Sequence, residues 1–288
     1  MPRRRVMSAS ALNIKLHPHT PELYRALFDD VYQKRDCVKI RGTDWGTIGW
    51  MRPLNHVDPM EGLVGELYRF VNINSRDPWF DNRSREILEI GENDPPPVPD
   101  YLKPNLRRVL FIFYPQKHRL FFDSSKLSPS SAGKIFQGLF GSDHIVTKYG
   151  PVDVIVETSH EAIEKILKIP TKTRLEIYIS LPNPDETSHL ETKIRNRLAS
   201  QRAKTLTEKY TSDKHIGLEP DEETIALMQV ARSNGRITAI GYDGEKKIIE
   251  DTIPHPLVES EKYDPDRQPA INVLDALSSR LWSEISRI

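Results

Sequence analysis

The chain has 288 residues, of which 38% are hydrophobic, and its 41 Lys and Arg residues balance its 41 Asp and Glu residues, so the formal net charge is zero. This length allows one large domain or two ordinary ones to fold without metals or disulfides. The single cysteine, Cys37, excludes a disulfide framework and a cysteine-based zinc site within one chain, which indicates a reducing compartment. No stretch reaches the roughly 20 apolar residues of a membrane span, so we expect a cytoplasmic protein without membrane insertion.

The first third of the chain predicts strands around one helix. Residues 20–34 predict the helix, because Thr20 can cap it, Pro21 suits its first turn and apolar residues recur at helical spacing. Strands are predicted at 11–16, 37–42 and 61–74, although the last segment also allows a helix. Between them, residues 42–55 carry three glycines and two tryptophans and predict a loop.

A boundary is predicted after this region. Residues 75–104 are rich in Pro, Asp and Asn, which indicates a long loop, and we divide the chain near Pro99 into regions 1–99 and 100–288. Residues 107–123 then predict a β-hairpin, since two apolar strands flank a polar turn.

The second region predicts alternating helices and strands. Helices are predicted at 128–141, 159–169 and 190–204, with Ser128 as a cap and Gly141 at an end, and strands at 152–157 and 174–182. This alternation favours crossover connections and a partly parallel sheet covered by helices. Residues 224–251 predict strands about turns at 234–235 and 243–244. The whole pattern indicates an α+β, or mixed α/β, fold with a β-rich N-terminal region.

The closing segment, residues 272–285, predicts an amphipathic helix. Its apolar face, with Trp282 beside it, comprises Val273, Leu274, Leu277, Leu281 and Ile285. Such a face belongs to the core or pairs two chains by symmetric burial, and the second alternative predicts a homodimer.

No catalytic or metal signature is evident, so we assign no catalytic residue, no metal site and no cofactor. His17 and His19 could contribute to a metal site, together with carboxylates such as Asp77 or Asp81, only if the fold brings them together. A metal-dependent nuclease, or another phosphoryl-transfer enzyme, is the alternative function that they would support. His118 lies in the predicted hairpin turn, where a surface position is expected.

The densest basic cluster of the chain lies within the predicted helix 190–204. On a helix, Leu190, Ile194 and Leu198 form an apolar stripe with basic residues on both flanks. These basic residues are Lys193, Arg195, Arg197, Arg202 and Lys204, with Arg107 and Arg108 as auxiliaries elsewhere in the chain. Outward-facing cations can contact phosphates, and the helix has no aromatic residues for base stacking, so a duplex backbone is the expected ligand. A merely solvated face, or a protein-interaction module that docks an acidic partner, is the alternative.

The order of segments also carries a resemblance. "GELYRFVNI", "LFIFYPQKHRLFFDSS", "VDVIVETSHEAIEKIL", "RLEIYISLP" and "NGRITAIGYDGE" resemble, over most of the chain, a bacterial domain-of-unknown-function family. More distantly, the order of strands around the basic helix looks like the phage-exclusion protein RexA and the KwaB component of Kiwa defence. That resemblance implies a dimeric protein that binds duplex DNA without strong sequence preference and acts in anti-phage defence, with another defence protein as a further partner. This chain departs from that pattern in its longer, tryptophan-bearing N-terminal half and its neutral charge.

Overall fold

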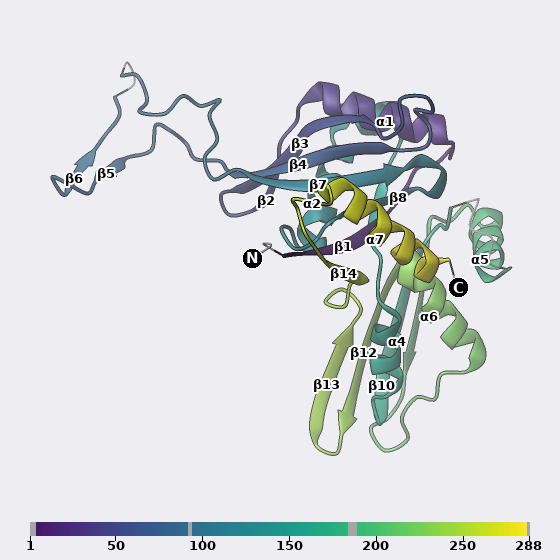
Figure 1. The fold of residues 1–288 in the computed structure, drawn as a ribbon. Coiled ribbons are helices and arrows are strands. Elements are labelled where there is room, and N and C mark those ends of the chain that lie inside the picture. The colour runs from purple at the N-terminus through teal and green to yellow at the C-terminus, as the bar shows by residue number, and fades with distance from the viewer. Residues whose placement is uncertain (1–3, 92–93, 184–188, 287–288) are drawn as a thin grey trace.

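The computed structural model describes residues 4–91, 94–183 and 189–286, which form an α+β fold on two separate β-sheets with a small third one (Figure 1). Every described strand pair is antiparallel. The predicted fold class is therefore confirmed, whereas the partly parallel sheet is wrong. Some helical connections lead to another sheet, and the one through His189–Ser200 joins two antiparallel neighbours, Thr171–Ser180 and Thr205–Thr211, so alternation does not make consecutive strands parallel neighbours.

The larger sheet contains eight strands. They are β1 (Arg5–Lys15), β2 (Val38–Arg41), β3 (Asp44–Pro53), β4 (Leu63–Val71), β7 (Arg107–Tyr114), β8 (Arg119–Asp123), β9 (Asp153–Val156) and β14 (Val258–Tyr263). Their order is β14-β1-β8-β7-β4-β3-β2, and β9 pairs with β1 beyond the end of β14. A short 3₁₀ helix, η1 (Pro115–Lys117), joins β7 to β8 and confirms the predicted hairpin.

Helices cover both faces of the larger sheet. One face packs against α1 (Pro21–Lys34), α2 (Pro129–Phe140) and α3 (Asp143–Tyr149), and the other packs against α7 (Ala270–Ile285). Thr20 and Ser128 cap α1 and α2 as predicted, because each side chain accepts a hydrogen bond from a backbone N–H in the first turn. The apolar face of α7 is buried in this core. It therefore does not provide the surface for a dimer, which was the alternative interpretation of this helix.

Strand β3 occupies the segment predicted as a Trp- and Gly-rich loop. Its glycines serve close packing rather than turns: a Cβ at Gly46 would lie 2.6 Å from the side chain of Ile135, and one at Gly49 would lie 2.4 Å from the ring of Tyr68. Glycine in a strand often marks such a close approach.

The smaller sheet has the order β11-β10-β12-β13. Its strands are β10 (Thr171–Ser180), β11 (Thr205–Thr211), β12 (Gly235–Asp243) and β13 (Lys246–Asp251). One face packs against α4 (His160–Leu167), α5 (His189–Ser200) and α6 (Glu222–Asn234), whereas no helix contributes to a core on the opposite face among the described residues.

Helix α6 corrects one prediction. Residues 224–234 were expected to be strand, followed by a turn at 234–235, but Asp221 caps a helix there by accepting a hydrogen bond from the backbone N–H of Thr224. Strand β12 begins directly at Gly235, where a Cβ would lie 1.8 Å from the carbonyl oxygen of Tyr178. The turn at 243–244 is confirmed, with Gly244 at a positive φ of 58°.

The loop predicted at residues 75–104 forms an extended segment, which we call the arm and define as the described residues 75–91 and 94–104. It projects away from both sheets and carries the two-stranded sheet of β5 (Trp79–Asp81) and β6 (Glu86–Leu88) (Figure 1). The base of the arm joins β4 to β7, which are neighbours in the larger sheet, so strands from both sides of Pro99 belong to one sheet. Across the described ranges, no helix combines the length and the apolar character that crossing a membrane requires.

Candidate nucleic-acid interface and neighbouring sites

Helix α5 carries the first part of the predicted basic surface. Ile194 and Leu198 are each 3% exposed and anchor the helix in the core of the smaller sheet, which confirms the apolar stripe. The helix ends at Ser200, so the prediction that it continues through residue 204 is wrong. Arg202 adopts a positive φ of 54°, and the carbonyl of Lys204 accepts a hydrogen bond from the backbone N–H of Leu181 at 2.9 Å. The chain turns here because it must enter β11 beside β10.

The five basic side chains therefore differ in setting. Lys193 pairs with Glu223 of α6 at 3.0 Å, and Arg197 pairs with Glu208 of β11 at 3.4 Å. Arg195 is half-buried and donates to the backbone carbonyl of Asn183.

The remaining two, Arg202 and Lys204, are exposed, and no other described side chain pairs with theirs. In the Lys193–Glu223 and Arg197–Glu208 ion pairs, the basic side chains are also largely exposed. Solvent and salt therefore weaken both ion pairs, and a phosphate can replace the carboxylate. We define the α5 surface as Lys193, Arg197, Arg202 and Lys204.

The predicted auxiliaries lie elsewhere. Arg107 and Arg108 begin β7 at the base of the arm, whereas α5 lies on the opposite side of the molecule (Figure 1). Arg108 donates to both carboxylate oxygens of Glu66, at 2.7 and 3.0 Å. The fold therefore does not bring these two arginines onto the α5 surface.

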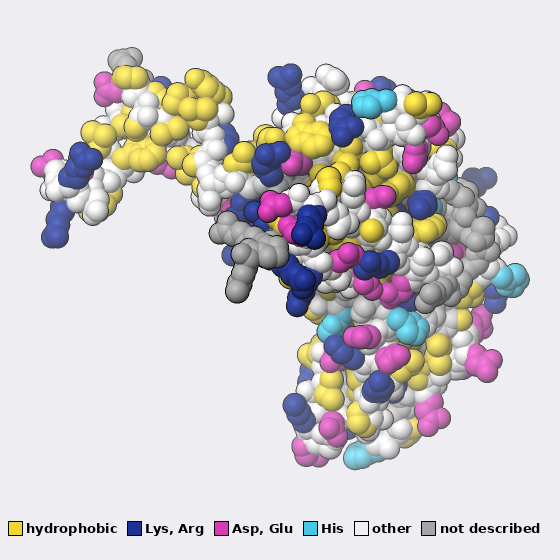
Figure 2. All heavy atoms as spheres, in the orientation of Figure 1, with side chains coloured by type: hydrophobic (Ala, Val, Ile, Leu, Met, Phe, Trp, Pro, Cys, Tyr) yellow, Lys and Arg dark blue, Asp and Glu magenta, His cyan; other side chains and the backbone are white. Residues whose placement is uncertain are grey.

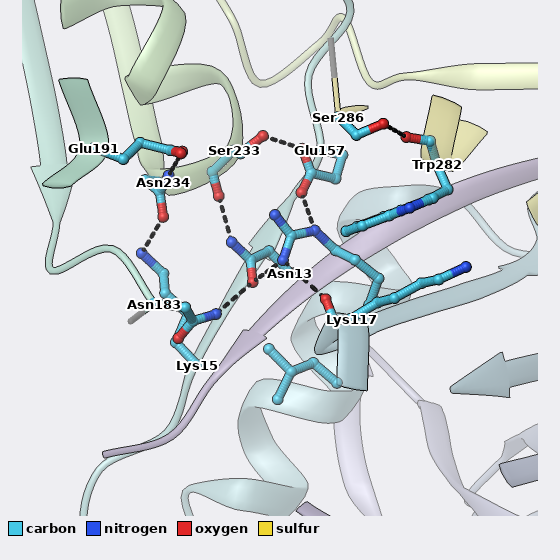
Figure 3. A network of polar contacts seen from close by, with 12 residues as sticks. Asn13, Lys15, Lys117, Glu157, Asn183, Glu191, Ser233, Asn234, Trp282 and Ser286 are labelled. Carbon is cyan, nitrogen blue, oxygen red and sulfur yellow. Dashed lines mark hydrogen bonds and ion pairs between the residues drawn. The ribbon is translucent and has the colours of Figure 1, made fainter. Parts of the chain in front are cut away.

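A buried polar network connects α5 to both sheets (Figure 3). Lys15 of β1 donates to the hydroxyl of Ser180 at 2.6 Å and to the side-chain carbonyl of Asn234 at 3.0 Å. The amide of Asn234 donates to Glu191, in the first turn of α5, at 3.0 Å. Lys15, Ser180, Asn234 and Glu191 are all nearly inaccessible to solvent. These contacts fix the first turn of α5 against the junction of the two sheets, and local sequence patterns did not indicate them.

The fold does not bring His17 and His19 together with Asp77 or Asp81, as the alternative metal-dependent function would require. His17 is exposed, and Nδ1 of His19 lies 2.9 Å from the hydroxyl of Tyr24. Asp81 belongs to β5 of the arm and Asp77 shortly precedes that strand, whereas His17 and His19 lie between β1 and α1, and the arm projects away from α1 (Figure 1). Among the described residues, no three His, Cys, Asp or Glu side chains converge as metal ligands would.

His118 is buried, which corrects its predicted surface position. It follows η1 with a φ of 43°, it is 3% exposed, and its ring lies 5.1 Å from that of His19. Burial, followed by the nearby charge of Arg119, holds the pKa of His118 well below its usual value. The neutral imidazole is therefore part of the core.

A cleft of about 630 Å³ lies between the two sheets, and no local sequence pattern indicated it. Its walls come from β2, α2, β9 and the start of β12. A second depression of about 520 Å³ continues over the open face of the smaller sheet, and the two share Ile155, Gly235 and Arg236.

The comparisons with known proteins give a family but no activity. The model of a domain of unknown function, DUF4747, matches residues 5–279. No curated protein matches the chain. Because the family model covers nearly the whole chain, the protein belongs to the DUF4747 family.

Proposed function

We propose that this protein binds duplex DNA through the phosphate backbone, without catalysis and without sequence preference, and that it acts in bacterial anti-phage defence. The observation that carries the proposal is the α5 surface, where four exposed cations are held on one helix and the turn that follows it. Phosphate contacts of this kind supply sequence-independent affinity.

Rigid placement supports this proposal. The helix is fixed by the burial of Ile194 and Leu198 and by the contact between Glu191 and Asn234. Cations on a fixed helix lose less conformational entropy on binding than cations on a flexible tail. The acids Glu208 and Glu223 reduce the local charge, so we expect modest affinity that depends strongly on salt.

The role in defence rests on the resemblance of the segment order to RexA and KwaB. Strand β10, the basic helix α5 and the strands that follow it are the elements that carry this resemblance. If the proposal is correct, expression of the protein in a bacterial host reduces the plating efficiency of at least one phage in a diverse panel. Equal plating by every phage with and without the protein counts against the defence role but leaves DNA binding to its own test.

The test of DNA binding is a salt titration with two unrelated duplexes. If four phosphates are neutralised, the logarithm of the binding constant falls against the logarithm of salt concentration with a slope of roughly −3 to −4. Replacement of Arg197, Arg202 and Lys204 by Ala should weaken binding to both duplexes alike and make the slope shallower by about 2 to 3. The fold should survive, because exposed charges contribute little to stability.

The matched control is Arg107→Ala with Arg108→Ala, which removes two exposed arginines from a different surface. This control should bind as the wild type does. Full binding by the triple variant, or no binding by the wild type at low salt, contradicts the proposal. Loss of DNA binding in the control variant alone would indicate that the interface lies at the base of the arm.

We also propose self-association, with the arm rather than α7 as the contacting surface. Phe80 and Ile87 are opposite each other on β5 and β6 and are 65% and 71% exposed. Tyr101, Leu102 and Leu106, which follow in the arm and at its base, are also more than half exposed. Hydrophobic side chains gather along the arm in Figure 2. An isolated two-stranded hairpin is at best marginally stable in water, and exposed apolar patches of this kind mark association sites.

Light scattering at micromolar concentration tests this second proposal. The wild type should have the mass of a dimer, because a two-fold axis buries the same surface of both copies. Replacement of Phe80 and Ile87 by Ser should give a monomer, whereas Ile249→Ser, at a 60% exposed position of β13, should leave the dimer intact. A monomeric wild type contradicts the proposal.

A further inference from the structure

The cleft between the two sheets has walls that are largely apolar. Val38 of β2, Val154 and Val156 of β9, and Ile253 after β13 contribute most of this character. Ser130 and Thr252 add hydroxyl groups. A concave, mostly apolar site of this volume with a few polar groups is typical of small-molecule binding.

Two lysines line the cleft without a counter-charge. Lys39 of β2 and Lys134 of α2 are exposed, and the side chain of neither forms a hydrogen bond or ion pair with any other residue that the structure describes. Arg236 is the third cation in the lining, and its partner is Asp251 at 2.6 Å. No Asp or Glu is among the described residues that line this cleft, and Glu176 in the adjoining depression is paired with Arg174, so the cleft itself attracts anions.

Packing holds the two lysine-bearing elements together. A Cβ at Gly138 would lie 2.4 Å from Val38, so α2 and β2 are in close contact at this point. Gly138 lies one turn after Lys134 on α2, and Val38 is adjacent to Lys39. Because successive strand residues point to opposite faces, Lys39 reaches the cleft from the face of β2 opposite Val38, whereas Lys134 lies on α2 itself.

The positive charge of the two lysines indicates which class of anion the cleft binds. A carboxylate carries one negative charge, whereas a phosphate monoester carries about −1.5 to −2 at pH 7 and matches two lysines. Ser130 lies in the first turn of α2, where the partial positive charge of the helix end adds to this attraction.

The continuation of the cleft indicates the rest of the ligand. Beyond Ile155 and Arg236 it reaches Tyr178, a 40% exposed aromatic side chain on the open face of the smaller sheet. A nucleobase can stack on such a ring. We infer that the cleft binds a nucleoside phosphate, with its phosphate at Lys39 and Lys134 and its base directed toward Tyr178.

This site lies apart from the α5 surface, and its test uses no duplex. Isothermal titration of the full chain with AMP, ATP, adenosine and inorganic phosphate should give the tightest binding for the nucleotides. Lys39→Ala and Lys134→Ala should each weaken nucleotide binding by about tenfold, the effect of losing one charged hydrogen bond. Tyr178→Ala should weaken nucleotide binding but leave binding of inorganic phosphate unchanged. This split separates the phosphate end of the site from the base end.

Lys246→Ala is the matched control, since Lys246 is an exposed lysine that does not line the cleft. It should bind nucleotides as the wild type does. Absence of nucleotide binding at millimolar concentration overturns the inference. Equal binding by the wild type and both lysine variants also overturns it. Loss of duplex binding by the α5 variants does not affect this result.

Discussion

The guanidinium of Arg119 and the carboxylate of Glu157 form an ion pair of 2.6 Å, although their side chains are only 2% and 0% exposed. Arg119 also donates to Asn13 at 2.8 Å, and Glu157 accepts a hydrogen bond from Ser233 at 2.6 Å. Arg119 lies on β8 of the larger sheet, and Ser233 lies on α6, which packs on the smaller one. Trp282 of α7 lies near the guanidinium, with its ring centroid 6.0 Å away (Figure 3). The Arg119–Glu157 ion pair therefore lies at the junction between the larger sheet and the smaller sheet with its helices.

Removal of one charge from this pair should be strongly destabilising. Glu157→Gln leaves the buried guanidinium without its counter-charge, and we expect it to lower the free energy of unfolding by about 3–5 kcal/mol. Glu164→Gln is the control, because Glu164 pairs with Lys168 at 3.1 Å on the exposed face of α4, where a change below about 0.5 kcal/mol is expected. Urea denaturation measures both. A Glu157→Gln variant as stable as the control would contradict this account.

The buried His118 predicts a dependence of stability on pH. Its folded-state pKa lies below the unfolded value near 6.5, so between these values the unfolded chain binds a proton that the folded chain does not. The contribution of His118 is therefore complete above about pH 6.5 and is lost as pH falls toward the folded-state pKa. The free energy of unfolding should fall by up to about 1.4 kcal/mol per pH unit from this group.

The variant His118→Asn tests this effect, since Asn tolerates the positive φ at this position better than most residues. Urea denaturation at pH 7.5 and 5.0 should show a smaller decrease for the variant than for the wild type. Equal decreases would mean that His118 does not titrate differently in the two states.

Two glycines of α2 should respond in opposite directions to Ala. A Cβ at Gly133 would meet Val156 at 3.5 Å, an ordinary contact, so Gly133→Ala should stabilise the protein by about 0.5–1 kcal/mol through helix propensity. A Cβ at Gly138 would lie 2.4 Å from Val38, so Gly138→Ala should destabilise it by about 1–3 kcal/mol despite the same gain in propensity. Thermal unfolding of the two variants provides the comparison. A shift in the same direction for both would contradict the packing argument.

Local signals identified most elements correctly. Thr20 and Ser128 correctly predicted the starts of their helices, because a capping side chain accepts a hydrogen bond from a backbone N–H within one turn. The same kind of reasoning failed at 224–234, where Asp221 supplied a cap outside the segment considered. It also failed at Gly46 and Gly49, because the side chains that require these glycines, Ile135 and Tyr68, are distant in the sequence.

The candidate site shows the same division. The alternation of Ile194 and Leu198 with basic residues predicted a buried stripe and exposed cations on α5, since helical periodicity is a local property. The end of that helix at Ser200 was decided by the entry of Thr205 into β11 beside Ser180.

The sequence by itself determined the α+β class, the hairpin at 107–123 and the buried faces of α1, α5 and α7, because these depend on periodicity and caps within one segment. Only the tertiary structure decided the antiparallel pairing, the burial of His118, the separation of Arg107 and Arg108 from α5, and the cleft that Lys39 and Lys134 share. The physical reason is that pairing, desolvation and the convergence of charges depend on residues far apart in the chain. No local pattern encodes the distance between such residues.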